Sequence, residues 1–208
     1  MSIEDKNIPV QHTGNHVDTV SEITLATKAE AERLFDKAKA KLLDMSNWEK
    51  VANGPSAEFQ LTDGAGNPVN RPAKQGDKFK IDLPLTPGST SGDGFDWVEV
   101  ENIQDDFNAK TDTTITSIRV RPSQNPDGNG KDIAHFFTNE STSTFLVKRQ
   151  GLTVSAEVHG RNETANTHAD HFWDRIRHVI VAMNAMFGFS KPQWKNLVNG
   201  LLDNDRPM

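Results

Sequence analysis

The chain has 208 residues with 23 basic and 29 acidic side chains, which gives a formal net charge of −6. It contains no cysteine, and this excludes disulfides, thiolate zinc sites, iron–sulfur clusters and cysteine nucleophiles. No apolar run approaches the roughly 18 residues of a membrane span, and neither half of the chain is basic. We therefore expect a globular protein with no membrane span, no nucleic-acid partner and no cofactor.

The N-terminal residues 1–16 are polar and show no apolar periodicity. They lack the apolar core of a secretory signal, so the sequence predicts a disordered tail and a cytoplasmic protein. A single domain is expected over 17–208, because no linker separates two compositions. Its first strand is predicted near 18–26.

A helix is predicted to begin at Thr27, because Glu30 follows three residues later and the two form a capping-box pattern. Apolar residues then recur every three or four positions at Leu34, Ala38, Leu42 and Met45. This spacing places them on one face of a helix.

Alternating apolar and polar residues predict a series of strands after the helix. The segments are 57–61, 78–83, 96–103, 113–122, 133–140, 142–150 and 152–160. Gln150 and Gly151 predict a hairpin turn between the last two.

The C-terminal region is predicted to be helical. Apolar residues at spacings of three and four favour a long amphipathic helix over about 168–187, which Gly188 ends. Pro192 in a first turn favours a shorter helix over about 191–202, with Trp194 and Leu197 in its apolar stripe.

This order of elements is α+β. It resembles the helix-grip fold of the START-related, polyketide cyclase-like (SRPBCC-type) superfamily, in which a strand runs into a helix and a Trp follows. The matching segment is VSEITLATKAEAERLFDKAKAKLLDMSNWEKV with Trp48, and TSTFLVKRQGLTVSAEVHGRNE leads towards the last helix. The resemblance implies a curved antiparallel sheet of about seven strands, wrapped around a long C-terminal helix, with a cavity for an apolar ligand.

Apolar residues of the predicted sheet and long helix are candidates for contact with such a ligand. They are Phe59, Phe79, Phe136, Val154, Ala156, Ile176, Ile180 and Met183. The alternative is that they only pack the core, because apolar periodicity does not separate a core from a pocket wall.

The segment HGRNE gathers the candidates for catalysis, His159, Arg161 and Glu163. Glu163 or His159 is suited to accept a proton, and Arg161 to bind a carboxylate or phosphate. The alternative is a structural turn with an Arg161–Glu163 ion pair, in which Asn162 caps the backbone. His171, Asp174 and His178 share a helix face, but a polar surface explains them better than a metal site, so we predict no metal.

Three functions remain open from the sequence. The first is a non-enzymatic protein that binds an apolar or amphipathic small molecule. The second is an enzyme of the cyclase, dehydratase or hydrolase type on the same fold. The third is an interaction module that forms a homo-oligomer through Trp194 and Leu197.

Overall fold

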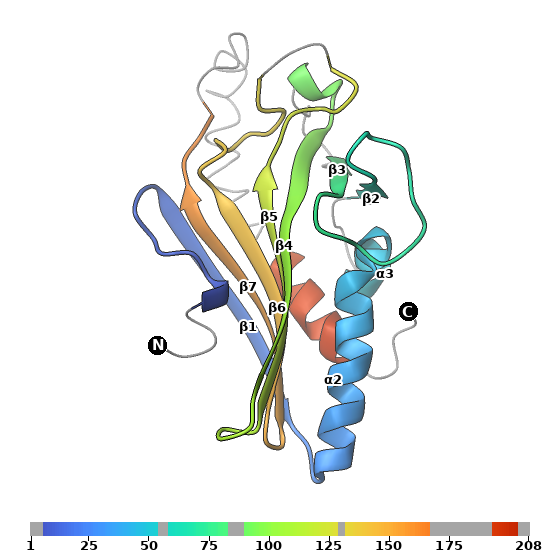
Figure 1. The fold of residues 1–208 in the computed structure, drawn as a ribbon, viewed down its shortest axis with the longest axis vertical. Helices are drawn as coiled ribbons and strands as arrows, with labels where there is room; N and C mark the ends of the chain where they lie inside the picture. The colour runs from blue at the N-terminus through green and yellow to red at the C-terminus, as the bar shows by residue number, and fades with distance from the viewer. Residues whose placement is uncertain (1–5, 54–57, 83–89, 129–131, 167–192, 204–208) are drawn as a thin grey trace.

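A computed structural model describes residues 6–53, 58–82, 90–128, 132–166 and 193–203 (Figure 1). Seven antiparallel strands form one sheet in the order β1-β7-β6-β5-β4-β3-β2. The strands are β1 (Asn15–Thr24), β2 (Glu58–Thr62), β3 (Lys78–Asp82), β4 (Asp96–Asn108), β5 (Thr113–Pro122), β6 (Thr142–Gln150) and β7 (Thr153–Glu163).

The described helices of five or more residues are α2 (Lys28–Leu43), α3 (Trp48–Ala52) and a C-terminal helix over 193–202. Two short 3₁₀ turns are also present: η1 (Met45–Asn47) lies between α2 and α3, and η2 (Thr90–Gly92) precedes β4. The predicted α+β class with about seven antiparallel strands is confirmed. The predicted long helix over about 168–187 lies outside the described residues.

Helix α2 begins where the sequence predicts. The Thr27 hydroxyl accepts a hydrogen bond from the Glu30 backbone N–H, and the Glu30 carboxylate accepts one from the Thr27 backbone N–H. This reciprocal pair satisfies two backbone donors that the helix itself leaves unpaired. The apolar stripe Leu34, Ala38 and Leu42 is fully buried.

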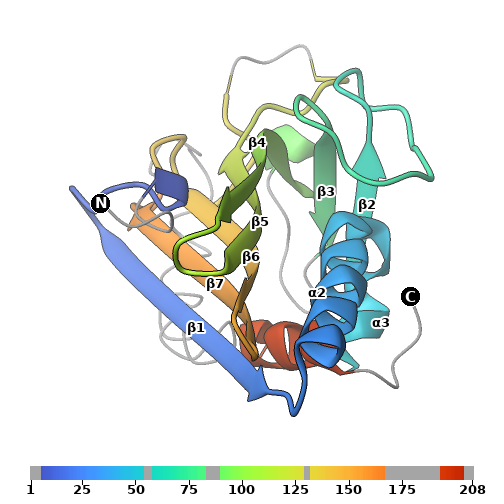
Figure 2. The same cartoon turned by 60° about the horizontal axis from the view of Figure 1, so that its bottom comes forward.

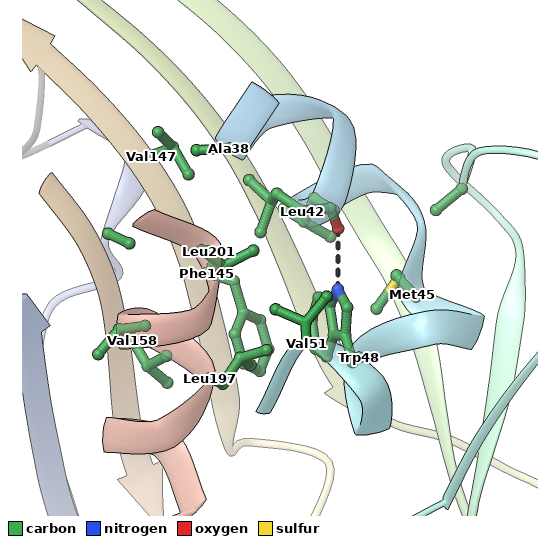
Figure 3. Packing of buried hydrophobic residues seen from close by; sticks show 14 of the residues in the cluster. Ala38, Leu42, Met45, Trp48, Val51, Phe145, Val147, Val158, Leu197 and Leu201 are labelled. Carbon is green, nitrogen blue, oxygen red and sulfur yellow. Dashed lines mark hydrogen bonds between the residues drawn. The ribbon is translucent and has the colours of Figure 1, made fainter. Parts of the chain in front are cut away.

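All three helices lie on the same side of the sheet, which we call the core face (Figure 2). Trp48 is completely buried there, and its Nε1–H donates to the Leu42 carbonyl at 3.2 Å (Figure 3). The C-terminal helix contributes Leu197 and Leu201 to the same cluster. Helices and sheet therefore share one hydrophobic core.

The N-terminal residues from 6 onward pack on the opposite side of the sheet, which we call the polar face. Asn7 is buried, and its side chain bonds to Asp106 on β4 and to Ser117 on β5. Asn162 holds the following segment, since its side-chain oxygen accepts from the backbone of His12 and Thr13. The structure thus gives defined contacts to residues that the sequence suggests as a tail.

Residues 133–138 form a strap across the ends of the strands, where the sequence predicts another strand. Ala134 is bonded to Trp97 at one end of the strap, and Thr138 to Thr164 at the other. The backbone groups of the strap are used in these crossing contacts, so they cannot form a strand ladder. The prediction of a strand over 133–140 is therefore wrong.

Candidate ligand-binding site

The core face carries an unbroken apolar row along β7 and β6. Val154, Ala156 and Val158 are each no more than 2% exposed and lie on this face, because alternate residues of a strand point to the same side. Phe145 on β6 lies directly opposite Val158 in the antiparallel register. Two predicted contact residues, Val154 and Ala156, therefore lie within the packed part of the core.

Five aromatic rings from separate elements meet on this face. Trp48 lies 5.6 Å from Phe59, 6.4 Å from Phe79 and 4.6 Å from Phe145, measured between ring centroids. Trp194 of the C-terminal helix contacts Phe145 at 5.3 Å. Phe79 is buried, whereas Phe59 and Trp194 are only partly buried. The cluster thus has two edges that are not fully covered.

Glu163 ends the apolar row of β7. A Cβ atom added at Gly160 would point to the core face, as Val158 does, and would collide with Glu163 Oε1. The Glu163 carboxyl group therefore lies over Gly160 on the core face. Burial raises the pKa of this carboxyl to about 7, although the charge of Arg161 opposes the shift.

A β-bulge brings Glu163 to this face. The register between β1 and β7 shifts near Val17, and Asn162 adopts a positive φ of 55°. An extra residue at a bulge reverses the alternation of the strand. Glu163, which follows the bulge, therefore points to the core face, whereas strict alternation from Val158 would place it on the polar face.

His159 and Arg161 point instead to the polar face. His159 Nδ1 lies 2.6 Å from Asp18 Oδ1, and its Nε2 lies 3.0 Å from Glu157 Oε2. Arg161 forms an ion pair with Asp18 at 2.7 Å. The three predicted catalytic candidates therefore do not share one face of the sheet.

The charged residues of this group form ion pairs with one another. Burial disfavours the charged form of His159, but hydrogen bonds to Glu157 and Asp18 outweigh it and raise the His159 pKa. Burial likewise opposes ionisation of Glu157, yet the bonds from His159 and Ser155 and the charge of Lys148 lower its pKa to about 2. The arrangement joins β1 to β7, and each charge has a partner.

The strap closes the core face at the Glu163 end and buries two further titratable groups. Burial raises the pKa of Asp96 to about 7, although a hydrogen bond from the Phe136 backbone N–H opposes the shift. Burial lowers the pKa of His135 to about 3, and its Nδ1 accepts from the Phe137 N–H at 2.9 Å. Phe136, a predicted contact residue, is half-buried and stacks on His135 at 4.2 Å.

Four buried polar atoms near this end lack a hydrogen-bond partner among the described residues. They are Trp97 Nε1 and the hydroxyl oxygens of Thr138, Thr142 and Thr164. A buried unpaired polar group costs about 1–3 kcal/mol, so folded proteins seldom contain several together.

Sequence reasoning did not select Asp96 or Ser143 as site residues. Asp96 occupies the same strand face as Val98 and Val100. An acidic residue at such an otherwise apolar position is the sequence feature that could have identified it. Ser143 lies opposite Gly160, and no feature of the sequence distinguishes it. The predicted contacts Ile176, Ile180 and Met183 lie outside the described residues, as do His171, Asp174 and His178.

No group of three or more His, Cys, Asp or Glu side chains in the described residues is placed to hold a metal ion. No helix in the same residues is long and apolar enough to cross a membrane.

No family model and no curated protein matches the chain. Solved structures that resemble it include an uncharacterised protein of Bacillus thuringiensis, with 20% identity, a TM-score of 0.40, and coverage of 91% of this chain and 100% of the other. Norcoclaurine synthase of Thalictrum flavum has 7% identity and a TM-score of 0.40, covering 92% and 98%. Ara h 8.0201 has 14% identity and a TM-score of 0.36, covering 91% and 100%.

The order of elements and the seven-stranded antiparallel sheet are those that the predicted resemblance implies. The resemblance concerns the fold, and the chemistry of this chain has to be argued from its own residues.

Proposed function

We propose that the protein binds an apolar or amphipathic small molecule on the core face. The observation that carries this proposal is the five-ring aromatic cluster, whose edges at Phe59 and Trp194 are only partly buried. Small-molecule sites are lined mainly by apolar and aromatic side chains, with a few polar groups at defined positions. Phe79 belongs to the same cluster, Val154 and Ala156 belong to the packed core beside it, and Phe136 lies in the strap at one end.

Native mass spectrometry of the purified protein, paired with a denatured spectrum of the same sample, is the first test. We expect extra mass that disappears on denaturation, which identifies a retained small molecule. Isothermal titration calorimetry with decanol then measures the affinity for an apolar ligand directly.

The Phe59→Ala variant tests whether the aromatic cluster contacts the ligand. We expect decanol affinity to fall roughly tenfold, because truncation removes about 1–2 kcal/mol of apolar contact. Phe107→Ala is the matched control, since Phe107 is 66% exposed on β4 and is not part of the cluster. A native mass equal to that of the polypeptide alone, together with no measurable decanol binding, would contradict the proposal.

A further inference from the structure

The Glu163 end of the core face contains two neighbouring polar side chains on β6 and β7. Ser143 on β6 is paired with Gly160, so its side chain projects beside the Glu163 carboxyl group. Neither Glu163 nor Ser143 has a side-chain hydrogen bond within the part of the chain that the structure describes. Val17 on β1 borders the same spot, 3.7 Å from the position of a Cβ at Gly160.

Glycine at position 160 provides the space for the carboxyl group. Its φ is not positive, so the backbone there is ordinary strand and does not require glycine. What the missing side chain permits is the close approach of Glu163 Oε1. A glycine within a strand often marks such an approach.

The charges at this end favour a cation. Asp96 is a second acid on the core face, because it is paired with Ile81, which packs against the core. His135 in the strap is neutral near pH 7, given its pKa of about 3. Arg161 is bound to Asp18 on the polar face. The described strands therefore place two acids at this end of the core face, Glu163 on β7 and Asp96 on β4. The cations Lys41 and Arg149 on the same side of the sheet are bound elsewhere, to the C-terminal helix and to Asp112.

We propose that Glu163, with Ser143 beside it, binds the protonated amine of an amphipathic ligand whose apolar part lies on the core face. The inference rests on the proposed function and specifies the ligand class. An ammonium group carries three donors, and the carboxylate and hydroxyl oxygens offer acceptors on one side. A charged hydrogen bond is stronger in a partly buried site than in water.

Decylamine and decanol are the probes, since they share an apolar chain and differ in the polar end. Calorimetry at about pH 8, where the Glu163 carboxyl is mostly ionised, measures both affinities. We expect decylamine to bind roughly tenfold to a hundredfold more tightly than decanol, which is the range that a hydrogen bond to a charged group supplies.

Glu163→Gln is expected to abolish this preference while decanol affinity stays within about twofold, and the retained decanol binding shows that the variant is folded. Glu22→Gln is the matched control, because it removes the same charge from an exposed position on the polar face of β1. It is expected to retain the preference.

Gly160→Ala provides a second variant that keeps the charge. The new Cβ displaces the end of a flexible side chain rather than backbone, so the fold is expected to accommodate it. The amine preference should fall because the carboxyl group no longer occupies its place.

Three results overturn the inference. These are equal affinity for both probes in the natural protein, a preference that survives in Glu163→Gln, and a preference that Glu22→Gln also removes. Failure of the proposed function looks different, because then decanol does not bind to any variant.

Discussion

At the scale of single residues, buried carboxyl groups on the core face determine how the protein responds to pH. Asp96 is 3% exposed, and its pKa of about 7 lies well above the ordinary value of 3.8. The folded state therefore binds a proton that the unfolded state releases at lower pH. The contribution of Asp96 to stability therefore falls as the pH rises from about 4 to about 7, because its folded form holds the extra proton over that interval.

Asp96→Asn tests this effect. Asparagine needs no ionisation and still accepts the Phe136 N–H, so we expect the variant to unfold at a higher temperature than the natural protein above pH 7. The expected gain is roughly 2–4 kcal/mol in the free energy of unfolding, and it should shrink to near zero at about pH 4. Urea denaturation across this pH range measures it.

The control is Asp127→Asn, because Asp127 is exposed. It should change stability by no more than about 0.5 kcal/mol at any pH. A loss of stability in Asp96→Asn above pH 7 would show that the Asp96 charge is stabilised by its surroundings instead.

At the scale of elements, one residue of β7 makes several hydrogen bonds to the N-terminal segment. Asn162 bonds to four residues of that segment: its oxygen accepts from His12 and Thr13, its amide donates to the Val10 carbonyl, and its backbone N–H donates to Gln11. It also adopts a left-handed backbone conformation, which asparagine tolerates better than most residues.

Two substitutions separate these roles. Asn162→Gly keeps the backbone conformation but removes the side-chain bonds, whereas Asn162→Ala removes the bonds and adds strain. We expect both to lose amide protection over 6–14 in hydrogen-exchange mass spectrometry, and Asn162→Ala to be the less stable by about 1 kcal/mol. Unchanged protection in both variants would mean that Asn7 and its partners hold the segment without Asn162.

The sequence predicted most elements because their signals are local. The capping box of α2 and the alternation in β5 to β7 depend on neighbours within a few residues. The strap was missed because residues 133–138 alternate like a strand, while their backbone partners lie on β4 and after β7.

The candidate site was only partly predictable for the same reason. Glu163 was selected within a polar cluster, but the bulge at Asn162 decides that it faces the core while His159 does not. A single inserted residue changes the facing of all that follow, and no short-range pattern reveals it. The importance of Gly160 likewise appears only when the Glu163 side chain is placed.

At the scale of the whole molecule, Lys41 connects both ends of the folded chain. It lies in α2 and is 2% exposed, and its Nζ donates to the carbonyls of Gly200 and Asp203 at the end of the C-terminal helix. A cation at that end also interacts favourably with the helix dipole. The C-terminal helix is thereby attached to the first half of the protein.

Lys41→Met is expected to lower the free energy of unfolding by about 1–3 kcal/mol, because it leaves helix carbonyls without this donor. Hydrogen exchange should show faster opening of 193–202 than of the sheet. Lys39→Met is the control, since Lys39 pairs with Asp105 at a more exposed position. Equal effects of the two variants would contradict a special role for Lys41.

The aromatic cluster also governs how the protein absorbs and emits light. The chain contains four tryptophans and no tyrosine, so its near-ultraviolet signal arises almost entirely from indole. Trp48 is held rigidly among Phe59, Phe79 and Phe145. Such an asymmetric, immobile setting produces strong near-ultraviolet circular dichroism, which is lost when tertiary packing loosens before secondary structure does. A simple spectrum therefore distinguishes the packed protein from a loosened one.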